Sequence, residues 1–481
     1  MSLLKHLGTP NPSALACLAF TLIPALAFGQ ITLSPGDDVQ AAVDRNPPGT
    51  TFALNGGIFR LQMVRPKDGD TFVGTPGTTL SGAALLTDFG REGALWVVYN
   101  QGQQGQLNGF CDNRHPRCAY PEDLYFDDRP LLHVADLGSV GPGAWFFDYA
   151  NQKIYFADDP TGHKVEVSVM RSAFSGSASN VAISTLVIEK YAVPGQFGAI
   201  GDQYPGPNWL VINDELRWNH GTGINLGDGG QAIGNFVHDN GQKGIGAGGQ
   251  NVLVQGNQIS FNNWAGFDPA WDSGGAKFAQ TNGLVVRGNF VHDNAGPGLW
   301  SDVDSINTLY ENNTVVNNVG GAGIQYEVSY AATIRNNVVR NNSVGNSSWM
   351  WGAQILLQNS RDVAVYGNTV EVASDRGNGI GIIQQYRGDG AYGPHIAANN
   401  SIVNNSIIHR QSPQGVNGEV SDYDETGLLQ YQSNIFDFNA YHVTDPTAWH
   451  WRWNGYQDWG GMHAVGQELH GTIDSNLPPA Q

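Results

Sequence analysis

Apolar residues along this chain occur in short β-branched runs separated by glycine and asparagine. Runs such as TIR (333–335), NVV (337–339) and TVV (314–316) leave no room for a helix. With them recur seven asparagines, spaced 22 to 32 residues apart: Asn235, Asn257, Asn289, Asn313, Asn337, Asn368 and Asn400. A period of about 20 to 50 residues is typical of a solenoid. The pattern therefore predicts an all-β chain folded as a parallel β-helix.

The asparagines also predict how the rungs of this solenoid are held together. Like positions of successive rungs lie about 4.8 Å apart, so identical side chains stack. A second asparagine follows five residues after the first at Asn240, Asn262, Asn294, Asn318, Asn342 and Asn405. We therefore expect two columns of amides, each amide donating to one neighbouring rung and accepting from the other. Asparagine also suits the left-handed backbone of a tight bend.

The repeat divides the chain into five predicted segments. A short helix over 36–46 places Val39, Ala42 and Val43 on one face, as expected for a cap on the open end of the solenoid. Between 94 and 170 the repeat is replaced by hairpin patterns, of which WFFDY and KIYFA are the clearest. The predicted segments are a signal peptide (1–29), cap and first rungs (30–93), an inserted antiparallel β subdomain (94–170), the β-helix with its cleft (171–440) and a Trp-rich capping tail (441–481).

The first segment predicts export. Lys5 precedes an apolar run over 14–28 with small residues at its end, the pattern of a cleaved signal peptide. We therefore expect a secreted or periplasmic protein without a membrane span. Cleavage removes Cys17, and the two remaining cysteines, Cys111 and Cys118, are expected to form a disulfide.

Charge narrows the range of partners. The chain has 24 Lys and Arg against 43 Asp and Glu, a formal net charge of −19. Nucleic acids and anionic membranes need a basic surface, so neither is an expected partner. We expect a monomer that acts on a polysaccharide or oligosaccharide.

The phrases GGAKF (274–278), GPGLWSDVDS (296–305), GIQYEVS (323–329) and QQYRGDGAYGP (384–394), together with the cap and the VHDN rungs, resemble secreted bacterial right-handed parallel β-helix proteins of the pectin lyase-like superfamily. The resemblance covers nearly all of the mature chain and implies a right-handed solenoid. It leaves the activity open, because the superfamily includes polysaccharide lyases, glycoside hydrolases, uronan epimerases and adhesins.

Two carboxylates are the predicted catalytic residues. The segments 298–302 and 323–327 are equivalent and one rung apart, with Leu299, Ser301, Ile324 and Tyr326 expected inward. Asp302 and Glu327 then stack as outward neighbours. Repulsion raises the pKa of one of them, and such a pair suits the hydrolysis of a glycosidic bond without a cofactor. The structural alternative is a solvated pair neutralised by Lys277 or Arg335.

Neighbouring side chains are predicted to bind the substrate. Trp300 is expected to stack on a sugar ring, Lys277 to lie beside it, and Gln358, Gln384 and Arg387 to continue the carboxylate column. Longer rungs place loops at 263–273, 346–351 and 386–393, which make an aromatic-walled cleft. The full predicted set is Lys277, Trp300, Gln325, Gln358, Gln384, Arg387, Trp271 and His220.

Two other functions fit the same residues. A polysaccharide lyase or uronan epimerase would use Lys277 as base with Arg387, and would bind calcium through Asp268, Asp272, Asp302 or Glu327. Against it, the candidate base and acid do not lie on neighbouring rungs, whereas the carboxylates do. A non-catalytic glycan-binding or adhesion protein is the third possibility.

Overall fold

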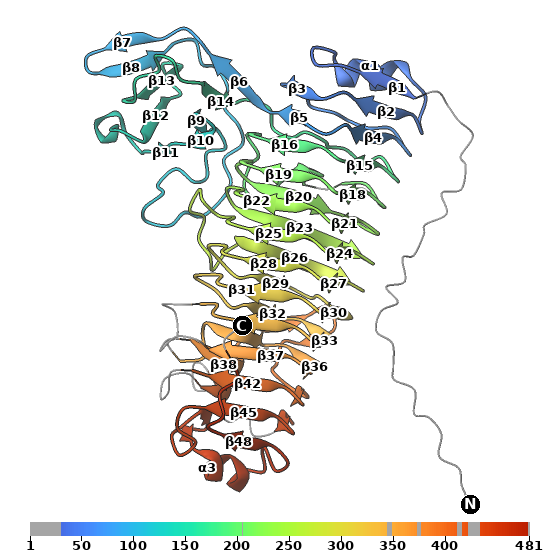
Figure 1. Ribbon diagram of the computed structural model, residues 1–481, viewed down its shortest axis with the longest axis vertical. Helices are drawn as coiled ribbons and strands as arrows, with labels where there is room; N and C mark the ends of the chain where they lie inside the picture. Colours follow the sequence, from blue (N-terminus) through green and yellow to red (C-terminus); the bar gives the residue numbers. More distant parts are fainter. Residues whose placement is uncertain are drawn as a thin grey trace, which may run out of the picture.

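The computed structural model describes residues 30–203, 205–343, 349–372, 377–410, 416–421 and 433–479. The predicted signal peptide lies outside these ranges. Three long sheets, named A, B and C, run along the molecule, and most turns of the chain contribute one strand to each sheet (Figure 1). Pairing between turns is parallel, so the predicted all-β parallel β-helix is confirmed.

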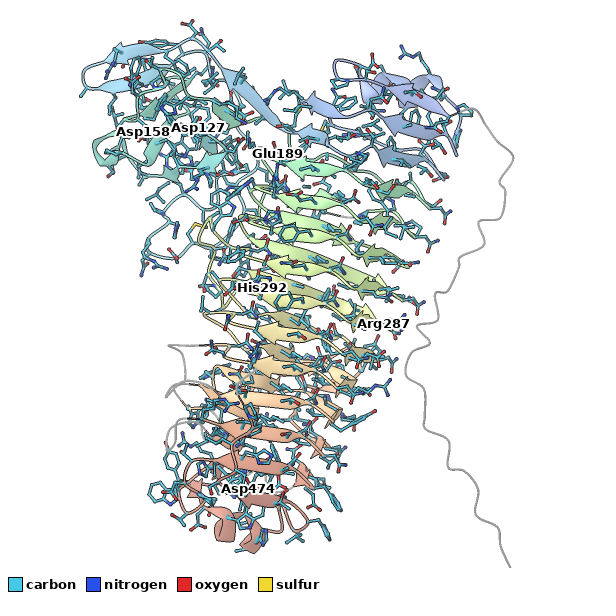
Figure 2. All side chains as sticks on the ribbon, in the orientation of Figure 1. Asp127, Asp158, Glu189, Arg287, His292 and Asp474 are labelled. Atoms are coloured by element: carbon cyan, nitrogen blue, oxygen red, sulfur yellow. A yellow bond between two sulfur atoms is a disulfide. The ribbon has the colours of Figure 1, made fainter. Side chains whose placement is uncertain are left out.

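Sheets A and B each have 13 strands. Sheet A contains β1 (Ile31–Leu33), β2 (Thr51–Leu54), β4 (Thr71–Gly74), β15 (Ala182–Ser184), β18 (Leu210–Ile212), β21 (Gln231–Ile233), β24 (Leu253–Gln255), β27 (Val285–Arg287), β30 (Thr308–Glu311), β33 (Tyr330–Arg335), β36 (Arg361–Tyr366), β41 (Ser401–Val403) and β44 (Ile435–Asp437). Sheet B contains β3 (Gly57–Arg60), β5 (Thr78–Ser81), β16 (Val187–Glu189), β19 (Glu215–Arg217), β22 (Phe236–His238), β25 (Gln258–Ser260), β28 (Phe290–His292), β31 (Thr314–Val316), β34 (Val338–Arg340), β37 (Thr369–Val372), β42 (Ser406–His409), β45 (Ala440–Val443) and β48 (Thr472–Asp474). Arg287 at the end of β27 and His292 at the end of β28 lie on different sides of the solenoid (Figure 2).

Sheet C has 11 strands and carries the candidate site. It contains β17 (Gly198–Ile200), β20 (Thr222–Leu226), β23 (Lys243–Gln250), β26 (Gly274–Asn282), β29 (Leu299–Asp302), β32 (Ile324–Glu327), β35 (Ala353–Gln358), β38 (Asn378–Gln384), β43 (Asn417–Ser421), β46 (Trp451–Trp453) and the antiparallel β47 (Tyr456–Gln457). A two-stranded ribbon of β39 (Asp389–Gly390) and β40 (Gly393–Pro394) follows β38.

The asparagine columns lie inside the bends and link successive turns. In the first column each amide accepts from the backbone N–H and the side-chain Nδ2 of the asparagine one turn before it, as Asn313 does from Asn289 at 3.0 and 2.9 Å. The second column starts with Asn219 and Asn240 and ends where Gln354 replaces an asparagine. Buried amide groups are thus paired along the whole stack.

The predicted last step of the first column is wrong. Asn368 donates to Asn405, 37 residues further on, and Asn405 donates to Asn439. Asn400 belongs to another column and donates to Asn434. The segment 400–405 offers two asparagines five residues apart, and because this turn is longer than the others, spacing alone selects the wrong one.

Both ends of the solenoid are covered. Helix α1 (Val39–Arg45) is capped by the Asp38 side chain, which accepts from Ala41 N, and it buries Val39, Ala42 and Val43 at the N-terminal end. At the other end the rungs continue past 440 through β45 and β48, and Trp451 fills the bore. Helix α3 (Trp459–Ala464) closes this end. No helix of the described ranges is long and apolar enough to cross a membrane.

The antiparallel subdomain stands beside the upper rungs (Figure 1). Its first strand is β6 (Ala83–Leu86), which pairs with the last, β14 (Val165–Ser168), so it starts before residue 94. The apolar sequence of β6 resembles that of a rung strand, and for this reason the predicted boundary at residue 94 lies too late in the chain. The remaining strands are β7 (Gly90–Glu92), β8 (Leu95–Val98), β9 (Leu124–Phe126), β10 (Arg129–Pro130), β11 (Leu132–His133), β12 (Ala144–Asp148) and β13 (Lys153–Phe156), with a 3-10 turn at Leu137–Ser139. The predicted disulfide between Cys111 and Cys118 is present in the long loop between β8 and β9.

Candidate active site

Successive strands of sheet C place the candidate residues in register. Lys277 of β26 pairs with Trp300 of β29, which pairs with Gln325 of β32. Ser301 pairs with Tyr326, so Asp302 and Glu327 follow as neighbours at the ends of their strands. Leu299, Ser301, Ile324 and Tyr326 fill the interior, and their relative exposure is 0%. The alternation predicted from the sequence is therefore present on this sheet.

Glu327 lies where two hollows meet, and Asp302 lines the larger of the two. The larger hollow, about 930 Å³, extends along sheet C toward β20, and the smaller, about 360 Å³, extends toward β35. Both are lined by Trp300, Glu327 and Arg387. Asp302 is 9% exposed and Glu327 7%, so the carboxylates form a floor and are not solvated surface groups. The cleft thus has room on both sides of the carboxylate pair.

Asp302 is held by an ammonium group. Its Oδ2 lies 2.8 Å from Lys277 Nζ, and its Oδ1 accepts from Val303 N at 2.8 Å. Lys277 Nζ also donates to the carbonyl oxygen of Trp271 at 2.7 Å and lies 3.4 Å from the centre of the Trp300 ring. The cation therefore has three partners, and it holds the Asp302 carboxyl group in place.

Glu327 has a different set of partners. Its Oε1 accepts from Arg387 at 2.7 Å, and its Oε2 accepts from Trp300 Nε1 at 3.1 Å and Gln325 Nε2 at 3.0 Å. Burial, and then the nearby Asp302 carboxylate, raise the pKa of Glu327, while Arg387 acts in the opposite direction. One acid of the pair is therefore more easily protonated than a free glutamate.

The structural alternative, a carboxylate pair neutralised by Lys277 or Arg335, agrees with the structure for Lys277 only. Each carboxylate is paired with a cation, but the second cation is Arg387; Arg335 binds Glu311 on sheet A instead. The expected role of Trp300 is wrong, because Lys277 covers its ring and its relative exposure is 3%. Trp300 instead donates its indole N–H to Glu327.

The column that contains Asp302 and Glu327 continues to Gln358, as predicted, but the next residue differs from the prediction. Gln358 pairs with Glu327, but Ile383, not Gln384, pairs with Gln358. Gln384 is buried and accepts from Ala397 N. A shift of one residue moves a side chain to the other face of a strand, which removes Gln384 from the cleft. Arg387 reaches Glu327 from the turn that follows β38.

His220 lies outside the cleft, contrary to the prediction. Its Nδ1 lies 3.0 Å from Asp123 and its Nε2 donates to the carbonyl oxygen of Cys118 at 2.7 Å. Both partners belong to the inserted subdomain, and the three residues line a separate hollow of about 240 Å³. The position of His220 in the sequence suggests a place near the site, but the inserted subdomain covers the His220 side chain.

The loop 263–273 forms one wall of the cleft. Trp271 lines the larger hollow, as predicted, but the proposed calcium ligands are engaged elsewhere. Asp272 lies 2.6 Å from Lys243 Nζ with both side chains buried, and Asp268 accepts from Ala270 N. Among the described residues no group of three or more His, Cys, Asp or Glu side chains could hold a metal ion.

Sequence reasoning missed Lys243, which lines the larger hollow. It begins β23 one turn before β26 and pairs with Gly274. The phrase KGIGAGGQ, which aligns with GGAKF in the next turn, could have indicated it.

Comparisons with known proteins agree on the fold. The family model described as "Right handed beta helix region" matches residues 202–370. A structure of XylC in complex with xylose is 14% identical, covers 94% of this chain and 87% of its own, and has a TM-score of 0.69. The A-module of mannuronan C-5 epimerase AlgE4 from Azotobacter vinelandii is 13% identical, covers 92% of this chain and 97% of its own, and has a TM-score of 0.51.

No curated protein matches the sequence. At these identities the structural likenesses bear on the fold alone. The chain folds as a right-handed parallel β-helix.

Proposed function

We propose that the protein is a carbohydrate-active enzyme that hydrolyses glycosidic bonds with Asp302 and Glu327. The supporting observation is a pair of adjacent, buried carboxylates that line the cleft, each with a different cationic partner. Two carboxyl groups that differ in protonation are what glycoside hydrolysis requires.

In this mechanism Glu327 is the acid. Its raised pKa allows it to carry a proton, which it donates to the departing glycosidic oxygen as the bond from carbon to that oxygen breaks. Protonated Glu327 needs an acceptor, and the amide of Gln325 supplies one if it turns its oxygen toward Oε2. Asp302, held beside Lys277, either attacks the anomeric carbon or takes a proton from the attacking water.

The charges of the cleft support an uncharged sugar. The larger hollow is lined by Asp228, Asp272, Asp302 and Glu327 against Lys243, Lys277 and Arg387. Each of these three cations is already paired with one of the acids. Only Arg387, whose partner Glu327 carries a proton in this mechanism, would be available to a uronate, whereas neutral hydroxyls can bind to all of the paired groups. The likeness to the structure of XylC with xylose, a neutral sugar, accords with this.

The lyase or epimerase alternative has less support. A lysine that abstracts a proton needs a free amino group, but Lys277 Nζ is already engaged, 2.8 Å from the Asp302 carboxylate and 2.7 Å from the Trp271 carbonyl oxygen. The likeness to a mannuronan C-5 epimerase keeps this activity as the second candidate.

The test is turnover of purified protein on a panel of neutral and uronic polysaccharides and oligosaccharides. Hydrolysis predicts new reducing ends without the absorbance of an unsaturated uronate. Asp302→Asn and Glu327→Gln should each lower kcat by about 100-fold or more. Glu311→Gln is the matched control, since Glu311 also pairs with an arginine but lies on sheet A; its kcat should equal that of the parent.

Other outcomes identify the alternatives. Unsaturated products, or epimerised uronates, would replace the hydrolase by a lyase or epimerase. Binding that survives both substitutions, with no product from any glycan, would leave an adhesion or glycan-binding protein. The predicted signal peptide and the disulfide support action outside the cytoplasm. We propose that the protein acts there as a monomer on a polysaccharide or oligosaccharide.

A further inference from the structure

The loop that contains the disulfide descends from the inserted subdomain along the solenoid (Figure 1). Its Cys118 end is attached to the solenoid, because the Cys118 carbonyl oxygen accepts from His220 Nε2 at 2.7 Å. His220 Nδ1 in turn lies 3.0 Å from Asp123. The disulfide joins this fixed end to Cys111, so the tip of the loop is tied to a buried anchor.

The tip of the loop holds the cleft wall 263–273. Asp112 N donates to Gly266 O at 2.8 Å, and Asp268 N donates to Phe110 O at 2.9 Å. These two bonds form a short antiparallel bridge in which Cys111 is opposite Phe267. The Phe110 ring meets Trp271 edge to face, with centroids 5.3 Å apart. Loop and wall therefore contact each other through backbone and side chains.

The wall, in turn, contacts the candidate catalytic pair. The Trp271 carbonyl oxygen accepts from Lys277 Nζ at 2.7 Å, and the same Nζ lies 2.8 Å from Asp302. A displacement of Trp271 would remove one of the three partners that place this ammonium group.

We propose that the disulfide-closed loop 108–118 is a positioning element of the active site, which acts through the wall 263–273 and Lys277 on Asp302. The inference rests on the proposed function for its catalytic consequence. The claim that the loop 108–118 holds the wall 263–273 in place rests only on the contacts between the loop, the wall and Lys277. None of the loop residues needs to touch the substrate.

The test uses the full chain with Phe110→Ala, Phe110→Tyr and the double variant Cys111→Ser with Cys118→Ser. Phe110 is 64% exposed, so its truncation should leave the fold intact. Phe261→Ala is the matched control: Phe261 is 50% exposed, also meets an aromatic ring edge to face, and lines none of the cleft. Two quantities are measured: amide hydrogen exchange over 263–277, and kcat and KM on the glycoside that the parent cleaves.

We expect Phe110→Ala and the double variant to exchange faster over 263–277. Their kcat should fall by about tenfold or more, because small displacements of reacting groups are costly. Their KM should change by less than about threefold. Because loss of folded protein alone would also lower the apparent kcat at constant KM, kcat is expressed per folded protein, as measured by circular dichroism. Phe110→Tyr should restore parental kcat, and Phe261→Ala should differ from the parent in neither quantity.

Unchanged exchange in Phe110→Ala would overturn the inference even if the double variant failed to fold. Faster exchange with unchanged kcat would overturn it as well, since the wall would then not place the catalytic groups. An inactive parent would instead contradict the proposed function, and the exchange data would still decide whether the loop holds the wall.

Discussion

Asp214 occupies a position in the bends where the following turns carry asparagine. Asn235 Oδ1 accepts from Asp214 N at 2.9 Å, and Asp214 Oδ1 accepts from Leu186 N at 2.8 Å. Its Oδ2 is buried and has no partner among the described residues. In the ladder asparagines an Nδ2 donor stands at the corresponding place. Burial raises the pKa of Asp214 to about 8, so the side chain is protonated at neutral pH.

The substitution Asp214→Asn should stabilise the protein, by about 1–3 kcal/mol at pH 7, because the amide has a donor at every pH, whereas the buried carboxyl must take up a proton on folding to have one. A carboxyl whose folded pKa is raised contributes most below its unfolded pKa of 3.8 and loses this contribution as pH rises through about 8. The advantage of the variant should therefore grow between pH 4 and pH 8. Urea denaturation at several pH values measures it.

Asp44→Asn, a change of an exposed carboxylate on α1, is the control for this series. An advantage of Asp214→Asn that is the same at pH 4 and pH 8 would show that Asp214 is ionised in the folded protein.

At the scale of elements, the ladders lie in the bends and add side-chain hydrogen bonds to the backbone pairing that joins successive turns. Asn289 Oδ1 accepts from the N and Nδ2 of Asn257, while its Nδ2 donates to Val254 O and Asn313 Oδ1. One side chain thus serves three successive turns. Its neighbours are buried, so no water replaces a lost partner.

Asn289→Ala should lower the free energy of unfolding by about 3 kcal/mol or more, since several buried donors and acceptors lose their partner. Gln231→Ala, an exposed polar residue at the start of β21, should change it by less than about 0.5 kcal/mol. Thermal or urea denaturation compares the two. Equal midpoints for the two variants would mean that the ladder adds little to stability.

The sequence predicted the elements that repeat and failed where the repeat is interrupted. The register of Asp302 and Glu327 is predicted correctly, because the two turns that contain them are equally long from one ladder asparagine to the next. Gln384 was misplaced by one residue, and Asn400 was assigned in place of Asn405, because the turn that contains them is the longest of the series. Spacing fixes register only while insertions are short.

Contacts between separate segments could not be predicted from spacing at all. His220 was assigned to the cleft, but the inserted subdomain covers it with Asp123 and Cys118. The pairing of Arg387 with Glu327 depends on a turn of irregular backbone. Such contacts are set by tertiary packing, on which a periodic pattern carries no information.

At the scale of the whole molecule, a buried ion pair joins the inserted subdomain to the solenoid. Lys190 lies next to Glu189, which Figure 2 labels at this junction, and its Nζ is 2.5 Å from Glu166 Oε2 on β14. Lys190 also pairs with Asp128. Lys190 is 0% exposed and Glu166 1%, and Arg60 approaches the other oxygen of Glu166 at 2.6 Å. The subdomain is thus attached by charges that water does not reach.

Lys190→Met should destabilise the docked subdomain by about 3–5 kcal/mol, because it leaves a buried carboxylate with one fewer cation. Limited proteolysis should then cut within 83–168 before it cuts the rungs. Lys153→Met is the control: its pair with Glu92 is more exposed, and such pairs contribute less than about 1 kcal/mol. If the two variants were cut at the same rate, the buried pair would not hold the subdomain.

The cleft crosses the turns of sheet C instead of following one strand, and this affects how its size can change. Duplication of one turn ahead of β26 would extend the trough by about 4.8 Å, while Asp302 and Glu327 kept their direct partners. Only the contact between the loop 108–118 and the wall 263–273 would have to adjust to the extra turn. Descendants of such a gene could acquire longer or shorter substrates in discrete increments, without redesign of the reacting centre.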